Sequence, residues 1–163
     1  MSVLPSIIHA LYENPISTHI RESEITFPVI QTFHALGIML MAGTIAVVDL
    51  RLLGVILRDR PSAEVAKPLL PLTWIGFVVM VISGGLLFAA QSEKIYGNTF
   101  LRIKFLLLIF AGLNVLVFHA TTYRSIQRWG AALTTPASAK LAGALSLLVW
   151  GGIIITGRFI AYY

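Results

Sequence analysis

Two histidines lie inside long apolar segments of the chain, His34 in FPVIQTFHALGIMLMAG and His119 in LLLIFAGLNVLVFHATTY. An imidazole in hydrocarbon is costly without a partner, so an ionisable residue within a membrane span is a functional candidate. Histidines that project into a helical bundle are well suited to hold a haem iron or another transition metal. The two residues therefore favour a haem or metal site inside a membrane bundle.

The two histidines lie at different depths along their predicted spans. His34 is about 9 residues from the outer end of its span, or ~14 Å deep at 1.5 Å per residue. His119 is about 15 residues past Lys104, or ~22 Å deep on the same side. One shared haem then needs a tilted helix or a shifted register. Two sites at different depths, each completed by another ligand, are equally open. His9 or His19 can reach an outer site, and a neighbouring subunit can supply a ligand to either.

Three basic residues at the outer ends of the later spans can bind haem propionates or lipid headgroups. They are Arg102, Lys104 and Arg158. Gln31, one turn before His34, is predicted to orient the imidazole. The plainer alternative is that His34 only bonds a neighbouring helix.

Composition places these residues in a membrane protein. Of the 163 residues, 57% are hydrophobic and 12% charged, whereas soluble domains carry about 25% charged residues. The apolar residues gather into four runs near the ~20 residues that a bilayer core demands. These runs are 26–50, 69–90, 105–123 and 141–160. The pattern predicts one all-α domain over 1–163, a bundle of four transmembrane helices.

The chain contains no cysteine. Cysteine-ligated iron–sulfur clusters, thiolate zinc sites, disulfides and covalent c-type haem are therefore excluded. Any haem would be a b-type haem held without covalent attachment. The net charge is +5, but the basic residues flank the spans and do not interleave with aromatic residues, so nucleic acid is not an expected partner.

The N-terminal segment 1–22 has apolar residues at helical spacing and no basic n-region, which argues against a cleaved signal peptide. It is predicted to form a short amphipathic helix at the membrane interface. Asn14 and Pro15 should end this helix, and Ser17 or Thr18 should cap a further turn. A poorly ordered tail is the alternative.

Loop charge sets the expected orientation. Seven of the 12 basic residues lie in 51–67 and 124–140, and five on the other side. This asymmetry predicts cytoplasmic loops at 51–67 and 124–140, with both termini periplasmic. Pro61 and Pro68 should break the first of these loops.

Small and polar residues within the spans predict helix contacts. Gly37 and Gly43 should permit a close approach by a neighbouring helix or a flat macrocycle on the first span. On the second span, Gly76 and Ser83, seven apart, should mark a close contact. Asn114 is predicted to bridge to another helix. Glycine and serine stripes on three spans favour a homo-oligomer.

The segments RESEITFPVIQTFHALG, GTIAVVDLRLLG and YGNTFLRIKFLLLIFAGLNVLVFH resemble an uncharacterised family of small bacterial four-span membrane proteins. The chain is more distantly similar to two other groups of membrane proteins. The likeness rests on His34 early in span one, Lys104 at the start of span three and His119 near its end. The small haem-containing protoporphyrinogen oxidases imply a b-type haem on His34. The four-span copper-resistance membrane proteins imply copper handling.

Together these features predict a protein that binds haem b and transfers electrons in the bacterial inner membrane. His34 is the expected first ligand and His119 the second, with quinone or a redox protein as partner. The alternatives are a haem-dependent porphyrinogen or quinone oxidoreductase, a copper-handling protein, and a structural membrane subunit. Copper is disfavoured because the four Met and four His form no close cluster.

Overall fold

The computed structural model describes residues 3–125 and 129–162, and within them it is all-helical, as predicted. The ends of the predicted domain and loop residues 126–128 lie outside the described residues. The elements are α1 (Val3–Tyr12), α2 (Pro15–Glu22), α3 (Thr26–Leu53), α4 (Ser62–Ile95), α5 (Thr99–Ala120), the 3₁₀ turn η1 (Tyr123–Ser125) and α7 (Ala137–Phe159).

Four of these helices, α3, α4, α5 and α7, are long and apolar enough to cross a membrane. Large apolar side chains cover their outer surfaces: Phe33, Trp74, Ile109 and Leu148 are each more than half exposed. Apolar patches of this extent are rare on soluble monomers, but in a bilayer such side chains meet lipid. The chain is therefore a multi-pass integral membrane protein.

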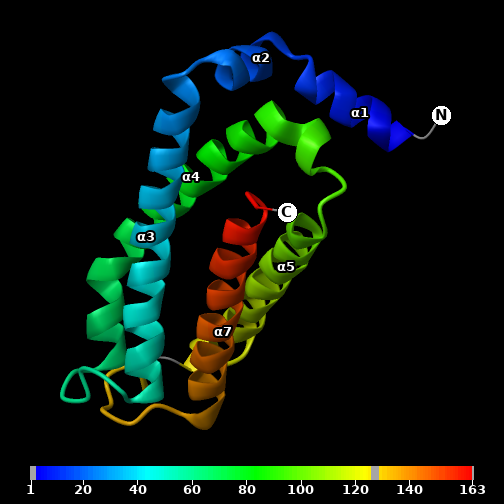
Figure 1. The fold of residues 1–163 in the computed structure, drawn as a ribbon. Coiled ribbons are helices and arrows are strands. Elements are labelled where there is room, and N and C mark those ends of the chain that lie inside the picture. The colour runs from blue at the N-terminus through cyan, green and yellow to red at the C-terminus, as the bar shows by residue number, and fades with distance from the viewer. Residues whose placement is uncertain (1–2, 126–128, 163) are drawn as a thin grey trace.

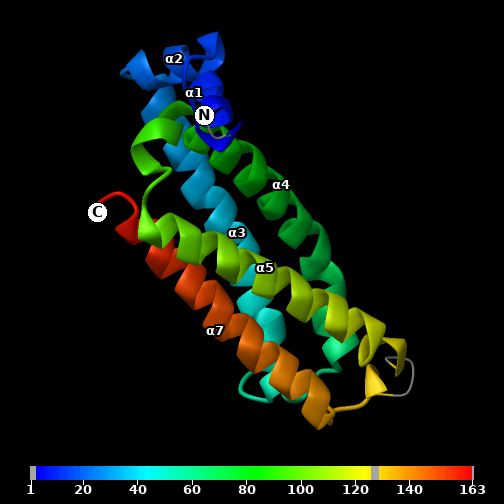
Figure 2. The same ribbon diagram turned by 90° about the vertical axis from the view of Figure 1, so that its right-hand side faces the viewer.

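The long helices form two antiparallel pairs. Helix α3 packs along α4, α5 packs along α7, and contacts between α3 and α7 join the two pairs. Figures 1 and 2 show the pairs as two layers that lie closest at the end with the α3–α4 and α5–α7 connections. Both ends of the chain lie at the opposite end, with α1 and α2. Four crossings account for the return of the chain to the side on which it began.

Helices α3 and α4 touch through their backbones. A Cβ atom at Gly76 would stand 2.7 Å from the Met41 amide nitrogen and 2.9 Å from the Gly37 carbonyl oxygen. Further along the same contact, the hydroxyls of Thr44 and Thr73 are 2.8 Å apart. The close contact predicted for Gly37 and Gly76 is confirmed, and it fixes α3 against α4 over several turns. The close approach by a helix predicted for Gly43 is wrong, because a Cβ there would meet nothing within 4 Å.

A hydrogen bond and a small residue define the packing of α7. Asn114 donates its side-chain amide to the Ala142 carbonyl, 3.0 Å away. A Cβ at Gly143 would stand 3.2 Å from the Asp49 carbonyl oxygen on α3. The predicted bridge from Asn114 to another helix is confirmed.

The second span begins earlier than predicted. Helix α4 starts at Ser62 and continues through Pro68 and Pro71, so the expected break at Pro68 is wrong. A proline removes one hydrogen bond to the carbonyl four residues before it. Here the affected carbonyls are those of Glu64 and Lys67, which lie in the polar first turns where water can replace the lost amide.

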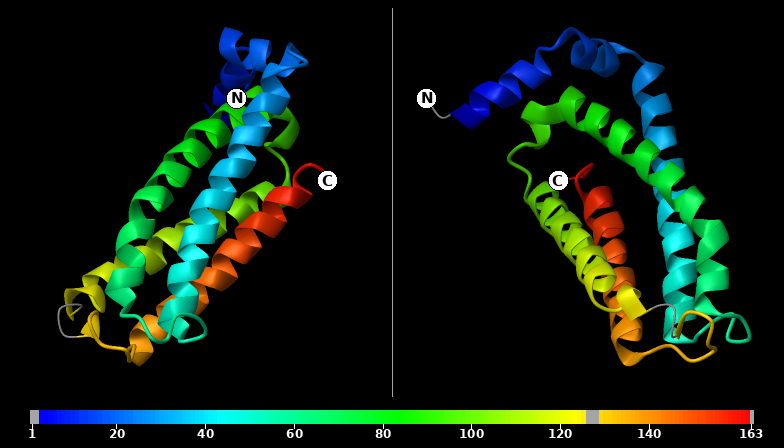
Figure 3. Two further views of the ribbon diagram at one scale, coloured as in Figure 1. Left: turned by 90° about the vertical axis from the view of Figure 1, so that its left-hand side faces the viewer. Right: turned by 180° about the vertical axis from the view of Figure 1, so that it is seen from behind.

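The N-terminal segment forms two helices, α1 and α2, whereas the sequence predicted one helix followed by a single further turn. Asn14 caps α2 by accepting a hydrogen bond from the Ile16 amide at 3.0 Å, and Pro15 takes the first helical position. The caps predicted at Ser17 or Thr18 are therefore wrong, and Ser17 is instead buried. Figure 3 shows α1 and α2 lying across the end of α4, outside the bundle.

Candidate functional site

The imidazole of His34 is half-buried on α3 and is held by α4. Its Nδ1 lies 3.0 Å from the hydroxyl of Ser83. The Ser83 hydroxyl donates its own hydrogen to the Val79 carbonyl, so towards His34 it can only accept. This arrangement makes Nδ1 the donor, and in that tautomer of the neutral imidazole Nε2 keeps a free lone pair.

The backbone of α4 lies directly against the same ring. A Cβ at Gly84 would stand 2.9 Å from Cε1 of His34, so only glycine leaves room for the imidazole in this position. Gln31, predicted to orient the ring, is exposed on α3. That prediction is wrong, and Ser83 performs the role from the neighbouring helix.

The second candidate side chain is that of Lys104, which comes from α5 and lies beside α7. Its Nζ is 3.4 Å from the position of a Cβ at Gly157 on α7, and its charge is near enough to act on His34. The half-buried ammonium forms no hydrogen bond or ion pair with any described residue. Next to it, Phe105 makes an edge-on contact with Phe88 of α4, with 6.1 Å between ring centroids.

The site therefore combines one oriented imidazole and one unpaired cation within apolar surroundings. A neutral imidazole nitrogen can bind a transition metal or accept a proton. A half-buried ammonium can bind a carboxylate or a polarised carbonyl. Within residues 3–125 and 129–162, no group of three or more His, Cys, Asp or Glu side chains could hold a bare metal ion.

His119 lies elsewhere in the molecule. It is exposed in the last turn of α5, where its Nδ1 donates to the Val115 carbonyl at 2.9 Å and its ring lies 4.9 Å from that of Tyr123. Helices α3 and α5 begin at the same end of the bundle, and His34 is near the start of α3. The structure does not bring the two histidines together, in agreement with the unequal depths expected from the sequence.

Of the three basic residues predicted to bind propionates or headgroups, only Lys104 is near His34. Arg102 is exposed on the first turns of α5. Arg158 is exposed near the end of α7, where it donates to the Tyr162 hydroxyl and lies 4.9 Å from the centre of that ring. His19 is also exposed, on α2.

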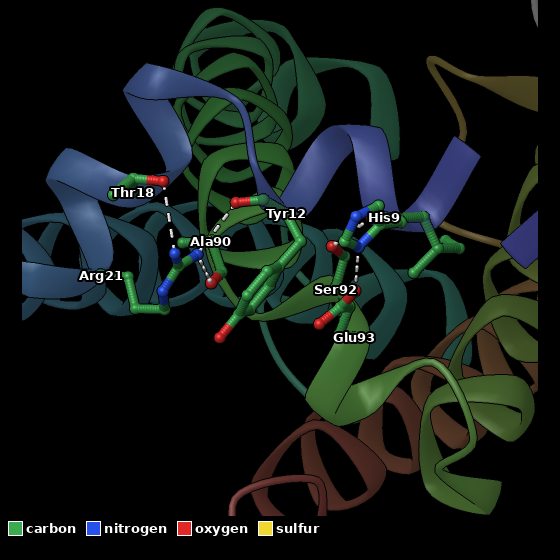
Figure 4. A network of polar contacts seen from close by, with 8 residues as sticks. His9, Tyr12, Thr18, Arg21, Ala90, Ser92 and Glu93 are labelled. Carbon is green, nitrogen blue, oxygen red and sulfur yellow. Dashed lines mark hydrogen bonds and ion pairs between the residues drawn. The ribbon is translucent and has the colours of Figure 1, made fainter. Parts of the chain in front are cut away.

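His9 belongs to a polar network that docks α1 and α2 on the end of α4 (Figure 4). Its Nδ1 is 2.6 Å from a carboxylate oxygen of Glu93, and this hydrogen bond raises the pKa of His9 above its usual value. Ser92 donates to the α1 backbone at 3.1 Å. Arg21 of α2 donates to the Ala90 carbonyl at 3.4 Å. These contacts commit His9 to α4 and away from His34.

One comparison with known proteins gives a match. Residues 22–163, which include all four long helices, match the model described as a family of unknown function (DUF6644). The chain belongs to this family. No curated protein and no solved structure matches it. The uncharacterised family predicted from the sequence is thus confirmed, while the likeness to oxidases and copper-resistance proteins stays a prediction.

Proposed function

We propose that this member of the family binds one b-type haem through Nε2 of His34 and transfers electrons in the bacterial inner membrane. The observation that carries the proposal is the hydrogen bond from Nδ1 to Ser83. With Nδ1 as the donor, the Nε2 lone pair would be free to bind the iron, and the hydrogen bond would increase the basicity of this ligand. The haem would be held without covalent attachment, since the chain has no cysteine.

A haem at this site would be held by two residues of this chain. His34 would bind the iron, and Lys104 offers an unpaired cation for a propionate. Gly84 and Gly157 keep the spaces beside these two side chains free of a Cβ. Bound haem would supply one-electron chemistry, while the apolar helices would exclude water. His119, the second ligand expected from the sequence, lies in the last turn of α5, so we propose that a neighbouring subunit would supply any second ligand.

A second candidate function uses the same two residues without haem. Nε2 of His34 would accept the proton of a quinol hydroxyl, and the Lys104 ammonium would stabilise the resulting charge. Among the described residues no second histidine lies near His34, which favours this alternative over a haem held by two histidines of one chain. In either function, the charge asymmetry of the loops predicts cytoplasmic connections and periplasmic termini.

The test is an absorption spectrum of protein purified from membranes, with haem content measured as the pyridine haemochrome. We expect about one haem per chain in the wild type, and at least a tenfold lower content in His34→Ala. His119→Ala is the matched control, because it removes an exposed histidine of the same bundle, and it should keep the wild-type content.

A colourless wild-type protein, or a His34→Ala variant with full occupancy, would contradict haem binding at His34. For a colourless protein, titration with a soluble ubiquinol analogue tests the second candidate. Binding that weakens at least tenfold in both His34→Ala and Lys104→Gln supports it, and binding unaffected by either change removes it.

A further inference from the structure

At the connection end of the bundle lies a buried arginine that has no negatively charged partner among the described residues. Arg51, in the last turn of α3, is only 1% exposed. It lies 17 residues after His34, or ~25 Å along the helix, so it is separate from the site described above. A buried charge without a counter-charge is costly, and this raises the question of what balances Arg51.

The partners of Arg51 within the described chain are all neutral. Its guanidinium donates to the Arg60 carbonyl at 2.6 Å, the Leu133 carbonyl at 3.1 Å and the Thr135 hydroxyl at 3.3 Å. A guanidinium has five N–H donors, so three bonds leave two donors, one on each terminal nitrogen. The ion pair found among the described residues is at the other end of the molecule, on α1 and α4.

A hollow of about 400 Å³ opens beside this guanidinium. Two further cations line it, Arg58 from the α3–α4 connection and Lys140 from the first turns of α7. Both are exposed, and neither forms a hydrogen bond or ion pair with any described residue. Thr134 and Thr135 add two hydroxyls, and no acidic side chain is among the described residues that line the hollow.

This arrangement selects one kind of ligand. Three cations, one of them buried with donors to spare, together with two hydroxyls are the groups that bind phosphate oxygens. We propose that the hollow binds a phosphate group, carried either by an anionic lipid headgroup or by a small soluble phosphate. The ligand would connect α3, its following loop and α7, because Arg51, Arg58 and Lys140 come from these three segments.

The first experimental arm tests a soluble source. The protein is placed in phosphatidylcholine nanodiscs, and inorganic phosphate is titrated at constant ionic strength by calorimetry. We expect saturable binding that weakens at least tenfold in the Arg58→Gln, Lys140→Gln double variant. These two side chains are exposed, so their replacement should leave the fold intact. Arg124→Gln is the control, since it removes an exposed cation that does not line the hollow.

The second arm tests a lipid source. Native mass spectrometry compares the retention of phosphatidylglycerol and phosphatidylcholine by the same three proteins. Preferential retention of phosphatidylglycerol that the double variant loses and Arg124→Gln keeps assigns the site to a lipid headgroup. If both probes bind the double variant as well as the wild type, or if Arg124→Gln loses as much as the double variant, the hollow is not a phosphate site.

Discussion

Replacing Gly84 with alanine tests the position of the His34 ring. The new methyl carbon would stand 2.9 Å from Cε1 of His34, whereas carbon atoms pack at about 3.5–4.0 Å. The ring must therefore retreat by roughly 0.6–1 Å. Its Nδ1 then passes from 3.0 Å to beyond the ~3.5 Å at which a hydrogen bond to Ser83 is lost.

The energetic effect follows from two opposing contributions. Loss of the Ser83 bond costs about 1 kcal/mol, and glycine to alanine within a helix gains about 1 kcal/mol. Gly84→Ala should therefore be nearly neutral in unfolding free energy. Gly85→Ala is the matched control, because a Cβ there meets nothing within 4 Å, and it should be about 1 kcal/mol more stable than the wild type.

Two measurements distinguish the variants in detergent micelles. Unfolding in mixed micelles containing dodecyl sulfate gives the free energies, and ¹⁵N NMR of labelled histidine reports which ring nitrogen of His34 carries the proton. We expect the His34 signals to change in Gly84→Ala and to stay at their wild-type positions in Gly85→Ala. Equal stabilisation of both variants with unchanged His34 signals would refute the placement of this ring against α4.

Two further predictions concern packing and pH. Gly76→Ala should destabilise the protein by about 1–3 kcal/mol through overpacking, because its Cβ would meet the Met41 backbone at 2.7 Å. Gly43→Ala is the control and should not destabilise the protein, because a Cβ there meets nothing within 4 Å. Unfolding in mixed micelles compares the free energies of the two variants. The hydrogen bond to Glu93 raises the pKa of His9 in the folded protein. Its stabilisation of docked α1 is therefore complete at pH values below the unfolded pKa of about 6.5. The stabilisation is lost as the pH rises through the folded pKa of His9. Hydrogen exchange of α1 should therefore quicken with rising pH more than intrinsic exchange does, and a Glu93→Gln variant that keeps this extra dependence would contradict the assignment.

Helix identity and several helix contacts were predictable because they follow from local chemistry. Span length and apolar content predict the four long helices, and glycine at Gly37 and Gly76 predicts the contact that the structure contains. Asn114 was predictable as a bridge, since a buried amide needs an acceptor. The start of α4 was not predictable from Pro68. A proline ends a helix or is tolerated within it depending on whether water reaches the carbonyl four residues earlier, which loses its hydrogen bond.

The hydrogen-bond partner of His34 was not predictable from its own helix, because it comes from the neighbouring helix α4. Gln31 is one turn away on the same helix, and sequence spacing alone therefore favours it as the partner. The actual partner, Ser83, is 49 residues away, and its register is set by the Gly37–Gly76 contact. From the sequence, Ser83 is predicted only as a packing residue, although a hydroxyl seven positions after Gly76 must face the same neighbouring helix.

Helix α4 is longer than the membrane that it crosses. Its 34 residues extend to about 51 Å, against ~30 Å for the hydrocarbon core. One end bonds to the opposite loop through Ala63 and Gly130, and the other bears α1 and α2. Both ends of α4 are attached to other segments of the chain, so we expect a thinner or thicker membrane to change the tilt of this helix. The ring of His34 packs against α4 at Gly84, so a change in the tilt of α4 would also change the position of the imidazole.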